Sequence, residues 1–227
     1  MKQTPIHNIY NAELLQLIPQ GLPRIVEIGC SSGALAREYL KRNPECDYIG
    51  VDIDPEYIEV ARSSCTRVMT GNIEQMNEAT FNSLFPSSCW VFADVLEHLY
   101  DPWTVLRRIR AKIASNACIA ACIPNAQHWS VQARLNSGEF RYEDLGLLDR
   151  THIRWFTKTT IVELFRDAGF AIAEGGGRVF QHEGTERGLE AVRAFAEQSG
   201  TDPEVAAQNA IPLQWLIRAV PDNTWCA

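Results

Sequence analysis

Long apolar runs are missing from this chain of 227 residues, and so is an excess of positive charge. The longest apolar stretches, such as "CWVFADVL" and "CIAACI", fall far short of the roughly 18 residues that span a bilayer, and the first residues have no apolar core of the signal-peptide type. The formal net charge is −7, whereas a large nucleic-acid surface needs clustered Lys and Arg. We therefore expect a soluble, cytoplasmic protein without a membrane or nucleic-acid partner.

Paired cysteine motifs and repeats are missing as well. The seven cysteines form no C-x-x-C motif, and Cys118 and Cys122 lie four apart in an apolar run, which predicts buried free thiols. The contents of 46% apolar and 22% charged residues are those of an ordinary globular protein, and the length suits one large domain. We expect a single domain over residues 1–227; a longer parent protein and a homo-oligomer both stay open.

Strand-like and helix-like patterns alternate through the first half of the chain. Pro55 opens one predicted helix at its favoured first-turn position, and Asp101 and Pro102 are predicted as the N-cap and first residue of another. Strands alternating with helices indicate a parallel, doubly wound sheet. The predicted strands are residues 24–28, 48–52, 66–70, 89–93, 117–123, 170–180 and 213–220.

The alternation stops after the fifth predicted strand. Residues 124–158 are rich in His, Trp and Arg and have no clean period, and a segment this long is typical of a functional lid. A helix follows, for which Thr160 and Glu163 fit a capping box and Gly169 fits a C-terminal stop. A helical insertion is predicted over residues 185–209, between the last two strands.

The stretch "VEIGCSSGALA" (residues 26–36) follows the first predicted strand and fits three kinds of site. It spells G-x-S-x-G, the nucleophile elbow of a serine hydrolase, but related hydrolases reach their elbow only after several strands. It also lies where a dinucleotide-binding G-x-G-x-x-G would lie, but Ser31 and Ala34 replace its second and third glycines and would crowd a pyrophosphate. The third kind is the first loop of an S-adenosylmethionine (SAM) site.

A SAM site needs groups for an amino acid part, a sulfonium and an adenosine. Glu27, which ends the first strand, is placed to orient the amino group, and Gly29 and Gly33 would let the chain pass close beneath the ligand. Asp52, which ends the second strand, can accept from both ribose hydroxyls, and Asn72 can meet the adenine edge. Neighbouring residues complete the predicted cofactor set: Cys30, Ser31, Ile53, Ile73 and Asp94.

Four motifs together resemble a known family. "VEIGCSSGALA", "GVDIDPEYIEVAR", "GNIEQM" and "DVLEHLYDP" are similar, in order and spacing, to the successive motifs of class I SAM-dependent methyltransferases over residues 10–180. The resemblance implies SAM as cofactor and an α/β, Rossmann-like, doubly wound and mostly parallel seven-stranded sheet with helices on both faces and a lid after strand five. The chain departs from many relatives at Ser31 or Ser32, where they have glycine, and at Asn72, where Asp is common.

The second half is similar to a narrower branch. "IPNAQHWS" and "GLLDRTHIRWFT" resemble methyltransferases associated with bacterial glycan and natural-product biosynthesis, which implies a sugar-like small-molecule acceptor. A hydroxyl acceptor must lose a proton, and histidine is the usual proton acceptor. His128 and His152 are therefore candidate bases, with Asp149 as a third; each also has a purely structural interpretation as a cap or loop contact. The aromatic residues of this segment are predicted either to bind the acceptor or to pack the lid: Trp129, Phe140, Tyr142, Trp155 and Phe156.

A metal site is a further hypothesis. Asp94, Glu97 and His98 resemble the E-x-x-E-H element of metal-dependent small-RNA 2′-O-methyltransferases, and His152 lies in a stretch that resembles the source of their remaining histidine. Two carboxylates and two imidazoles can hold a divalent ion that lowers the pKa of an acceptor hydroxyl. The alternative is that the acid and the imidazole only fix the start of a helix.

The sequence thus predicts a methyltransferase that moves a methyl group from SAM to a hydroxyl of a sugar-like acceptor. Three alternatives stay open: an N-methyltransferase acting on an amino sugar or similar amine, a metal-dependent RNA 2′-O-methyltransferase, and a SAM-binding module without catalysis. The methylated atom and the acceptor itself are beyond the reach of the sequence.

Overall fold

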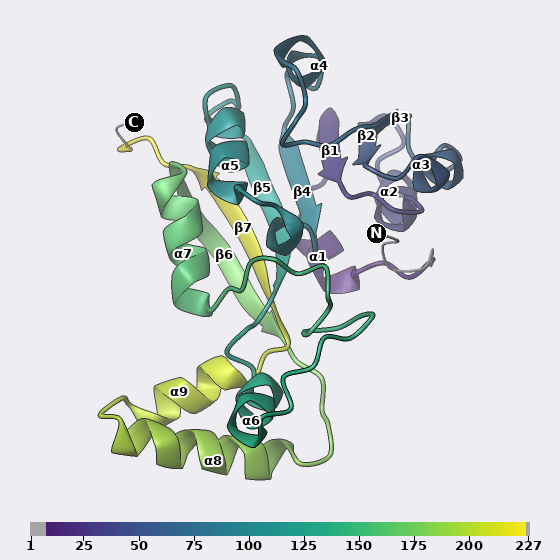
Figure 1. Cartoon of the computed structure of the whole chain (residues 1–227). Helices are drawn as coiled ribbons and strands as arrows, with labels where there is room; N and C mark the ends of the chain where they lie inside the picture. The colour runs from purple at the N-terminus through teal and green to yellow at the C-terminus, as the bar shows by residue number, and fades with distance from the viewer. Residues whose placement is uncertain (1–7, 226–227) are drawn as a thin grey trace.

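A single seven-stranded sheet organises the computed structural model, which describes residues 8–225 (Figure 1). The strand order is β3-β2-β1-β4-β5-β7-β6. The five strands from β1 to β5 pair in parallel, whereas β7 runs antiparallel to both β5 and β6. The predicted doubly wound, mostly parallel sheet is confirmed. The strands are β1 (Arg24–Ile28), β2 (Asp47–Asp52), β3 (Arg67–Thr70), β4 (Cys89–Ala93), β5 (Cys118–Pro124), β6 (Phe170–Arg178) and β7 (Gln214–Pro221).

Helices cover both faces of the sheet because successive strand residues point to opposite sides. Ile25 and Tyr48 pack into the apolar cluster on one face, and Val26 and Ile49 pack into the cluster on the other. The first face is covered by α1 (Ala12–Leu17), α2 (Ala34–Leu40) and α3 (Pro55–Ala61), and the second by α4 (Glu78–Asn82), α5 (Pro102–Arg110) and α7 (Lys158–Asp167).

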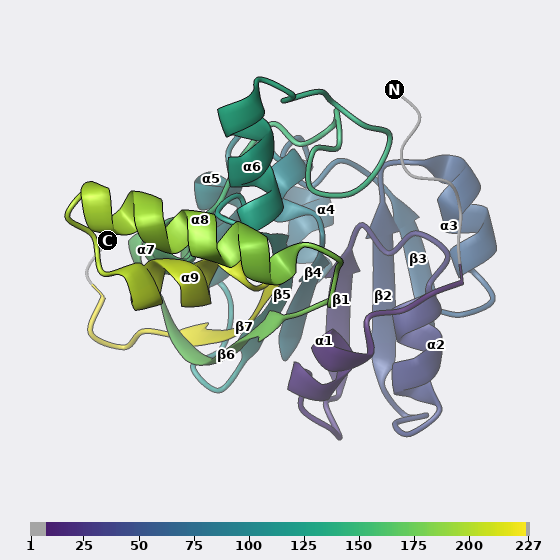
Figure 2. The same cartoon turned by 90° about the horizontal axis from the view of Figure 1, so that it is seen from below.

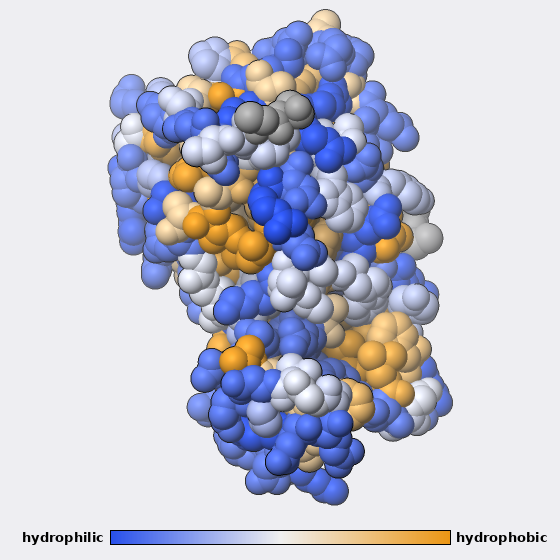
Figure 3. Space-filling model, turned by 90° about the vertical axis from the view of Figure 1, so that its left-hand side faces the viewer, coloured by the Kyte–Doolittle hydropathy of each residue, from blue (hydrophilic) through white to orange (hydrophobic). Residues whose placement is uncertain are grey.

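Three further helices form a separate lobe beyond the carboxyl end of β5 (Figures 1 and 2). They are α6 (Trp129–Ser137), α8 (Thr185–Gln198) and α9 (Pro203–Ala210). The lobe has a small apolar core of its own around Leu189 and Ala207, and Trp129 of α6 packs against it. Viewed from the side in Figure 3, it is the narrower lower part of the molecule, with a mostly hydrophilic surface.

The expectation that residues 124–158 have no regular structure is wrong for their first part. Helix α6 lies within them, capped at its start by the ring of His128 and ended by Gly138 in the left-handed conformation, with φ of 74°. Val131 is the one buried residue of this helix. Because α6 lacks an apolar stripe of its own, hydrophobic periodicity does not reveal it. The loop between α6 and α7 (residues 138–157), called the returning loop below, contacts the 3₁₀ turn η1 (Leu96–His98), which precedes α5. The N–H groups of Ile153 and Arg154 in this loop both donate to the Glu97 carbonyl.

The predicted helix starts at Pro55 and at Asp101–Pro102 are confirmed. Asp54 and Asp101 cap α3 and α5, each followed by proline. The predicted capping box of α7 is wrong by three residues: Thr157 is the N-cap, and Thr160 takes the place expected for Glu163. A threonine hydroxyl can return the hydrogen bond to the N-cap N–H as a glutamate does, so the box starts earlier than its usual S/T-x-x-E form indicates. Gly169 ends the helix with φ of 85°, as predicted.

The described part of the chain bears on two sequence predictions, those on membrane-spanning helices and on the state of the cysteines. No helix within residues 8–225 is long and apolar enough to cross a bilayer. The six cysteines in this range are buried and free, which confirms the predicted buried thiols at those positions: Cys30, Cys46, Cys65, Cys89, Cys118 and Cys122.

Candidate active site

A cavity of about 640 Å³ opens at the carboxyl ends of the parallel strands. Its centre lies between β1 and β4, where the strand order reverses and where open α/β sheets bind their ligands. Nine of the ten residues predicted for the cofactor line it: Glu27, Gly29, Cys30, Ser31, Asp52, Ile53, Asn72, Ile73 and Asp94.

Asp52 is held rigidly at the cavity wall. Its Oδ2 accepts from the Ser31 N–H at 2.9 Å and its Oδ1 from the Asp54 N–H at 3.0 Å, which fixes the orientation of the carboxylate. Burial raises the pKa of Asp52 above its usual value. A buried, doubly anchored carboxylate suits two vicinal hydroxyl donors such as those of a ribose.

Glu27 lies deeper in the same wall, with 3% of its surface exposed. The Tyr48 hydroxyl donates to its Oε2 at 3.0 Å. Burial raises the pKa of Glu27 to about 8, against the lowering effect of this hydrogen bond. The side chain is therefore mostly protonated at neutral pH in the free protein, and a ligand ammonium beside it would favour the ionised form.

The two glycines of the first loop have different roles. Gly29 lines the cavity with φ of 70°, and a Cβ there would lie 2.5 Å from Val95 Cγ2. Gly33 is not part of the cavity wall: it precedes α2 with φ of 72°, and a Cβ would lie 2.8 Å from Ser64 Cβ. Its predicted role beneath the ligand is not supported, because the space it keeps open is occupied by neighbouring residues of the chain itself.

Another part of the cavity wall combines apolar side chains with the side-chain amide of Asn72. Ile53 is 52% exposed there, and Ile73 forms a buried part of the wall. Asn72 Oδ1 accepts from the Glu74 N–H at 2.9 Å, which fixes its side chain at the wall. Exposed apolar surface next to a positioned amide suits a flat heteroaromatic base such as adenine.

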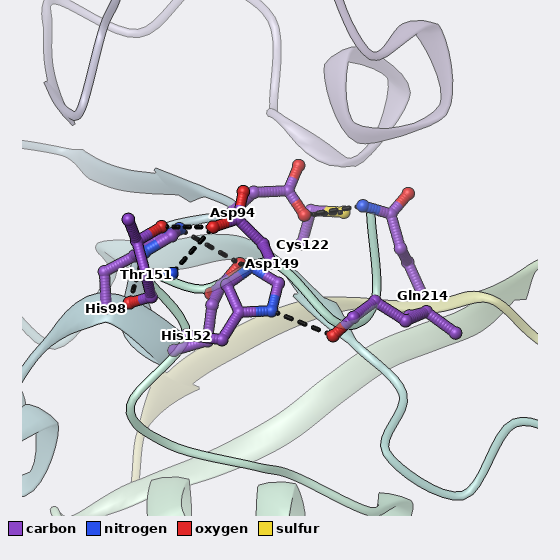
Figure 4. Close-up of polar contacts among 9 residues, drawn as sticks. Asp94, His98, Cys122, Asp149, Thr151, His152 and Gln214 are labelled. Atoms are coloured by element: carbon purple, nitrogen blue, oxygen red, sulfur yellow. Dashed lines mark hydrogen bonds and ion pairs between the residues drawn. The ribbon is translucent and has the colours of Figure 1, made fainter. Parts of the chain in front are cut away.

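Two imidazoles meet at the wall of the cavity that the returning loop forms (Figure 4). The rings of His98 and His152 have their centroids 4.8 Å apart. Each ring has its Nδ1 3.1 Å from a backbone carbonyl, that of Thr151 for His98 and that of Leu147 for His152. Burial lowers the pKa of both imidazoles, so that the neutral forms are favoured.

The structure separates the other predicted catalytic and metal residues. Asp94, with φ of 55°, points to Cys122 and Gln214 rather than to the imidazoles (Figure 4). Asp149 lines the cavity, but its Oδ1 accepts from the N–H and hydroxyl of Thr151 and thereby holds the loop turn. His128 is not in the cavity wall, and its Nδ1 faces Ser130 at the start of α6. The structure therefore does not support His128 as the base.

The aromatic side chains predicted as an acceptor platform are also outside the cavity wall. Phe156 lies in the main core, Trp129 packs against α8, and Trp155 stacks with Phe140. Sequence reasoning instead missed residues that do line the cavity: Tyr10, Asn11, Tyr57, Tyr100, Arg178 and Gln214. They come from distant parts of the chain, so no local spacing marks them.

Comparison with known proteins agrees with this geometry. A model described as a methyltransferase domain matches residues 7–174. The chain is 29% identical over 115 residues to a trans-aconitate 2-methyltransferase from Methylobacterium nodulans, and 29% identical over 126 residues to one from Pseudomonas aeruginosa. These matches cover 50% and 55% of the chain and 43% of each relative, so the chain spans less than half the length of the curated relatives it matches.

Solved structures share the fold. A SAM-dependent methyltransferase from Mesorhizobium loti superposes with a TM-score of 0.60 at 15% identity, covering 92% of this chain and 95% of that one. The plantazolicin methyltransferase in complex with SAH superposes with a TM-score of 0.58 at 14% identity, covering 93% and 80%. The fold and the family match together confirm the predicted methyltransferase class, with SAM as its cofactor. The chain belongs to the family of methyltransferase domains that this model describes.

Proposed function

We propose that this protein transfers the methyl group of SAM to a hydroxyl of a small, sugar-like acceptor. The observation that carries the proposal is the position of His98 and His152 in the wall of the same cavity that the cofactor residues line. Donor and acceptor groups would therefore share one enclosed space.

Methyl transfer from a sulfonium is an in-line displacement, so positioning supplies much of the rate. The hydroxyl must also lose its proton, and a group within hydrogen-bond reach has to accept it. Because a carbonyl oxygen only accepts hydrogen bonds, the Nδ1 of His152 that faces Leu147 carries the proton of the neutral ring. The Nε2 of that ring then has a lone pair, which supports His152 as the group that handles the acceptor proton.

The charge of the cavity supports a neutral or cationic acceptor. Among the described residues its wall contains the acids Glu27, Asp52, Glu74, Asp94 and Asp149. It contains one arginine, Arg178, whose guanidinium already pairs with Glu13 at 2.6 Å and donates to Gln214 at 2.9 Å. A carboxylate-rich acceptor, such as the one in the name of the curated relatives, would meet net repulsion here.

The same negative wall favours a second candidate, an amine acceptor such as an amino sugar. An amine enters as a cation and must lose its proton before it attacks, and the cluster around His152 could take that proton too. An RNA acceptor has less support, because the net charge is −7 and the cavity wall is acidic. A module that binds SAM without catalysis does not need two imidazoles beside the cofactor residues.

The proposal is tested by measuring SAH formation with neutral sugars, amino sugars and trans-aconitate as acceptors, with SAM affinity measured in parallel. We expect turnover with a hydroxyl acceptor, and a fall in kcat of about 100-fold or more in His152→Ala. His182→Ala is the control, because His182 is exposed and outside the cavity wall. Turnover with amines alone would show that the protein is an N-methyltransferase and not an O-methyltransferase. SAM binding without turnover of any acceptor would overturn it.

A further inference from the structure

Glu97 is a buried carboxyl group without a hydrogen-bond partner. It is 1% exposed, and neither Oε1 nor Oε2 has a partner among the described residues. Its Oε1 lies 3.9 Å from the Nε2 of His98 and 3.9 Å from the Nε2 of His152. The three side chains each direct one ligand-type atom into a common space, with these atoms within 4.8 Å of one another. We call them the Glu97 cluster.

The backbone determines which nitrogens face that space. The carbonyls of Thr151 and Leu147 accept from the Nδ1 atoms of His98 and His152, so both neutral rings present an unprotonated Nε2. The Glu97 cluster therefore gathers two imidazole lone pairs and the lone pairs of a carboxyl group, all directed at one point. Lone pairs arranged in this way repel unless a positive charge lies among them.

The surroundings add negative charge. The carboxyl groups of Asp94 and Asp149 lie close enough to add negative charge around Glu97. An ionised carboxylate that is buried without a partner costs several kcal/mol. Either a proton stays on Glu97 or a cation occupies the space between the three side chains.

We propose that Glu97, His98 and His152 bind a divalent transition-metal ion. Two imidazoles and one carboxylate form a ligand set that suits first-row divalent metals, and donation of each Nδ1–H to a carbonyl is the usual outer contact of a metal-binding histidine. The ligand set differs from the predicted one, because Asp94 is directed to Cys122 and Gln214 instead. The site follows from these side chains alone, whereas its use on an acceptor rests on the function proposed above.

The cluster is next to the cavity. His98 and His152 belong to its wall, and Glu97 lies behind them. A divalent ion at this place would supply positive charge that lowers the pKa of an acceptor hydroxyl. The two histidines would then hold the ion beside the acceptor, and Glu97 would balance its charge. With the ion bound, the Nε2 of His152 would be a ligand and no longer a base, so the acceptor proton would leave to water.

The test uses the full chain after chelator treatment and dialysis, titrated with Co²⁺ as a spectroscopic probe and with Zn²⁺ as a competitor in calorimetry. We expect one ion per chain and a visible Co²⁺ absorption band of a nitrogen- and oxygen-ligated site. Affinity should fall by about 100-fold or more in Glu97→Gln and in His98→Ala, since even outer contacts of metal ligands contribute 10- to 100-fold. His182→Ala should bind the ion as the unmodified chain does.

Unchanged SAM affinity shows that each variant is folded. His98→Ala serves if Glu97→Gln does not fold, because His98 is the most exposed member of the cluster, with 34% of its side chain accessible. Absence of Co²⁺ uptake by the unmodified chain, or equal uptake by all variants, would overturn the inference and leave a proton on Glu97. Full turnover after chelation would overturn the use of the ion on the acceptor while the proposed function stands. Ion binding without turnover of any acceptor would overturn the proposed function while the ion site stands.

Discussion

The cofactor side and the acceptor side of the cavity are built in different ways. On the cofactor side, Glu27 and Asp52 end their strands, and Asn72 follows β3 by two residues. On the acceptor side, the wall joins Asn11 of the α1 cap, His152 of the returning loop, and Gln214 of β7. The ends of adjacent parallel strands always meet at one edge of a sheet, whereas the acceptor side requires distant segments to pack first.

The anchors of the two sides differ accordingly. Backbone N–H groups within three residues of the strand ends fix Asp52. The imidazoles of the acceptor side are fixed by carbonyls of a loop that is itself attached through Ile153 to the Glu97 carbonyl. Changes to the loop should therefore affect the acceptor and leave SAM binding intact.

The largest expected effect is a loss of SAM affinity when the cofactor side is changed at Asp52. Asp52→Ala removes the acceptor of two hydroxyl hydrogen bonds, each worth about 1.5 kcal/mol or more when one partner is charged, so SAM affinity should fall by roughly 100-fold in calorimetry. Asp54→Ala is the matched control: it removes the α3 cap one turn away but keeps the carboxylate at 52. Equal losses in both variants would mean that Asp52 acts through the loop rather than on the ligand.

A smaller effect is expected for the pH dependence of SAM affinity, which tests the role of Glu27. Its pKa of about 8 in the free protein means that it is protonated below pH 8, whereas a bound ammonium favours the carboxylate. Binding must then release a proton, so SAM affinity should fall by up to about tenfold per pH unit as the pH drops below 8. Calorimetry between pH 6 and 9 measures this, and Glu27→Gln should remove the dependence. A flat profile for the unmodified chain would show that Glu27 keeps one protonation state on binding.

The smallest effect concerns the lobe formed by α6, α8 and α9. Alanine in a helix is usually favoured over glycine by about 1 kcal/mol, but a Cβ at Gly188 of α8 would lie 2.4 Å from the Trp129 ring of α6. Gly188→Ala should therefore destabilise the protein by about 1–3 kcal/mol in urea unfolding, with SAM affinity unchanged because no described residue of the lobe lines the cavity. Gly176→Ala is the control, because nothing lies within 4 Å of its Cβ. A stabilised Gly188→Ala would show that the ring moves freely.

Sequence reasoning reached the sheet, the helix starts at Pro55 and at Asp101, and nine of the ten predicted cofactor residues in the cavity wall, because each depends on neighbours in the chain. It missed α6, which has a single buried residue, and the start of α7, where Thr160 stands in for glutamate. It also gave Gly33 a place beneath the ligand, since the sequence does not say that Ser64 fills that space.

The sequence by itself determined the fold class and the cofactor edge, because strand periodicity and the residues that end each strand are local properties. Only the tertiary structure decided the acceptor side. It left His128 as a helix cap and directed Asp94 to Gln214, away from the predicted metal set. The other three residues of that set, Glu97, His98 and His152, were grouped by resemblance alone, and the structure supplies the distances between them. Long-range packing sets those distances, and no spacing within the sequence encodes them.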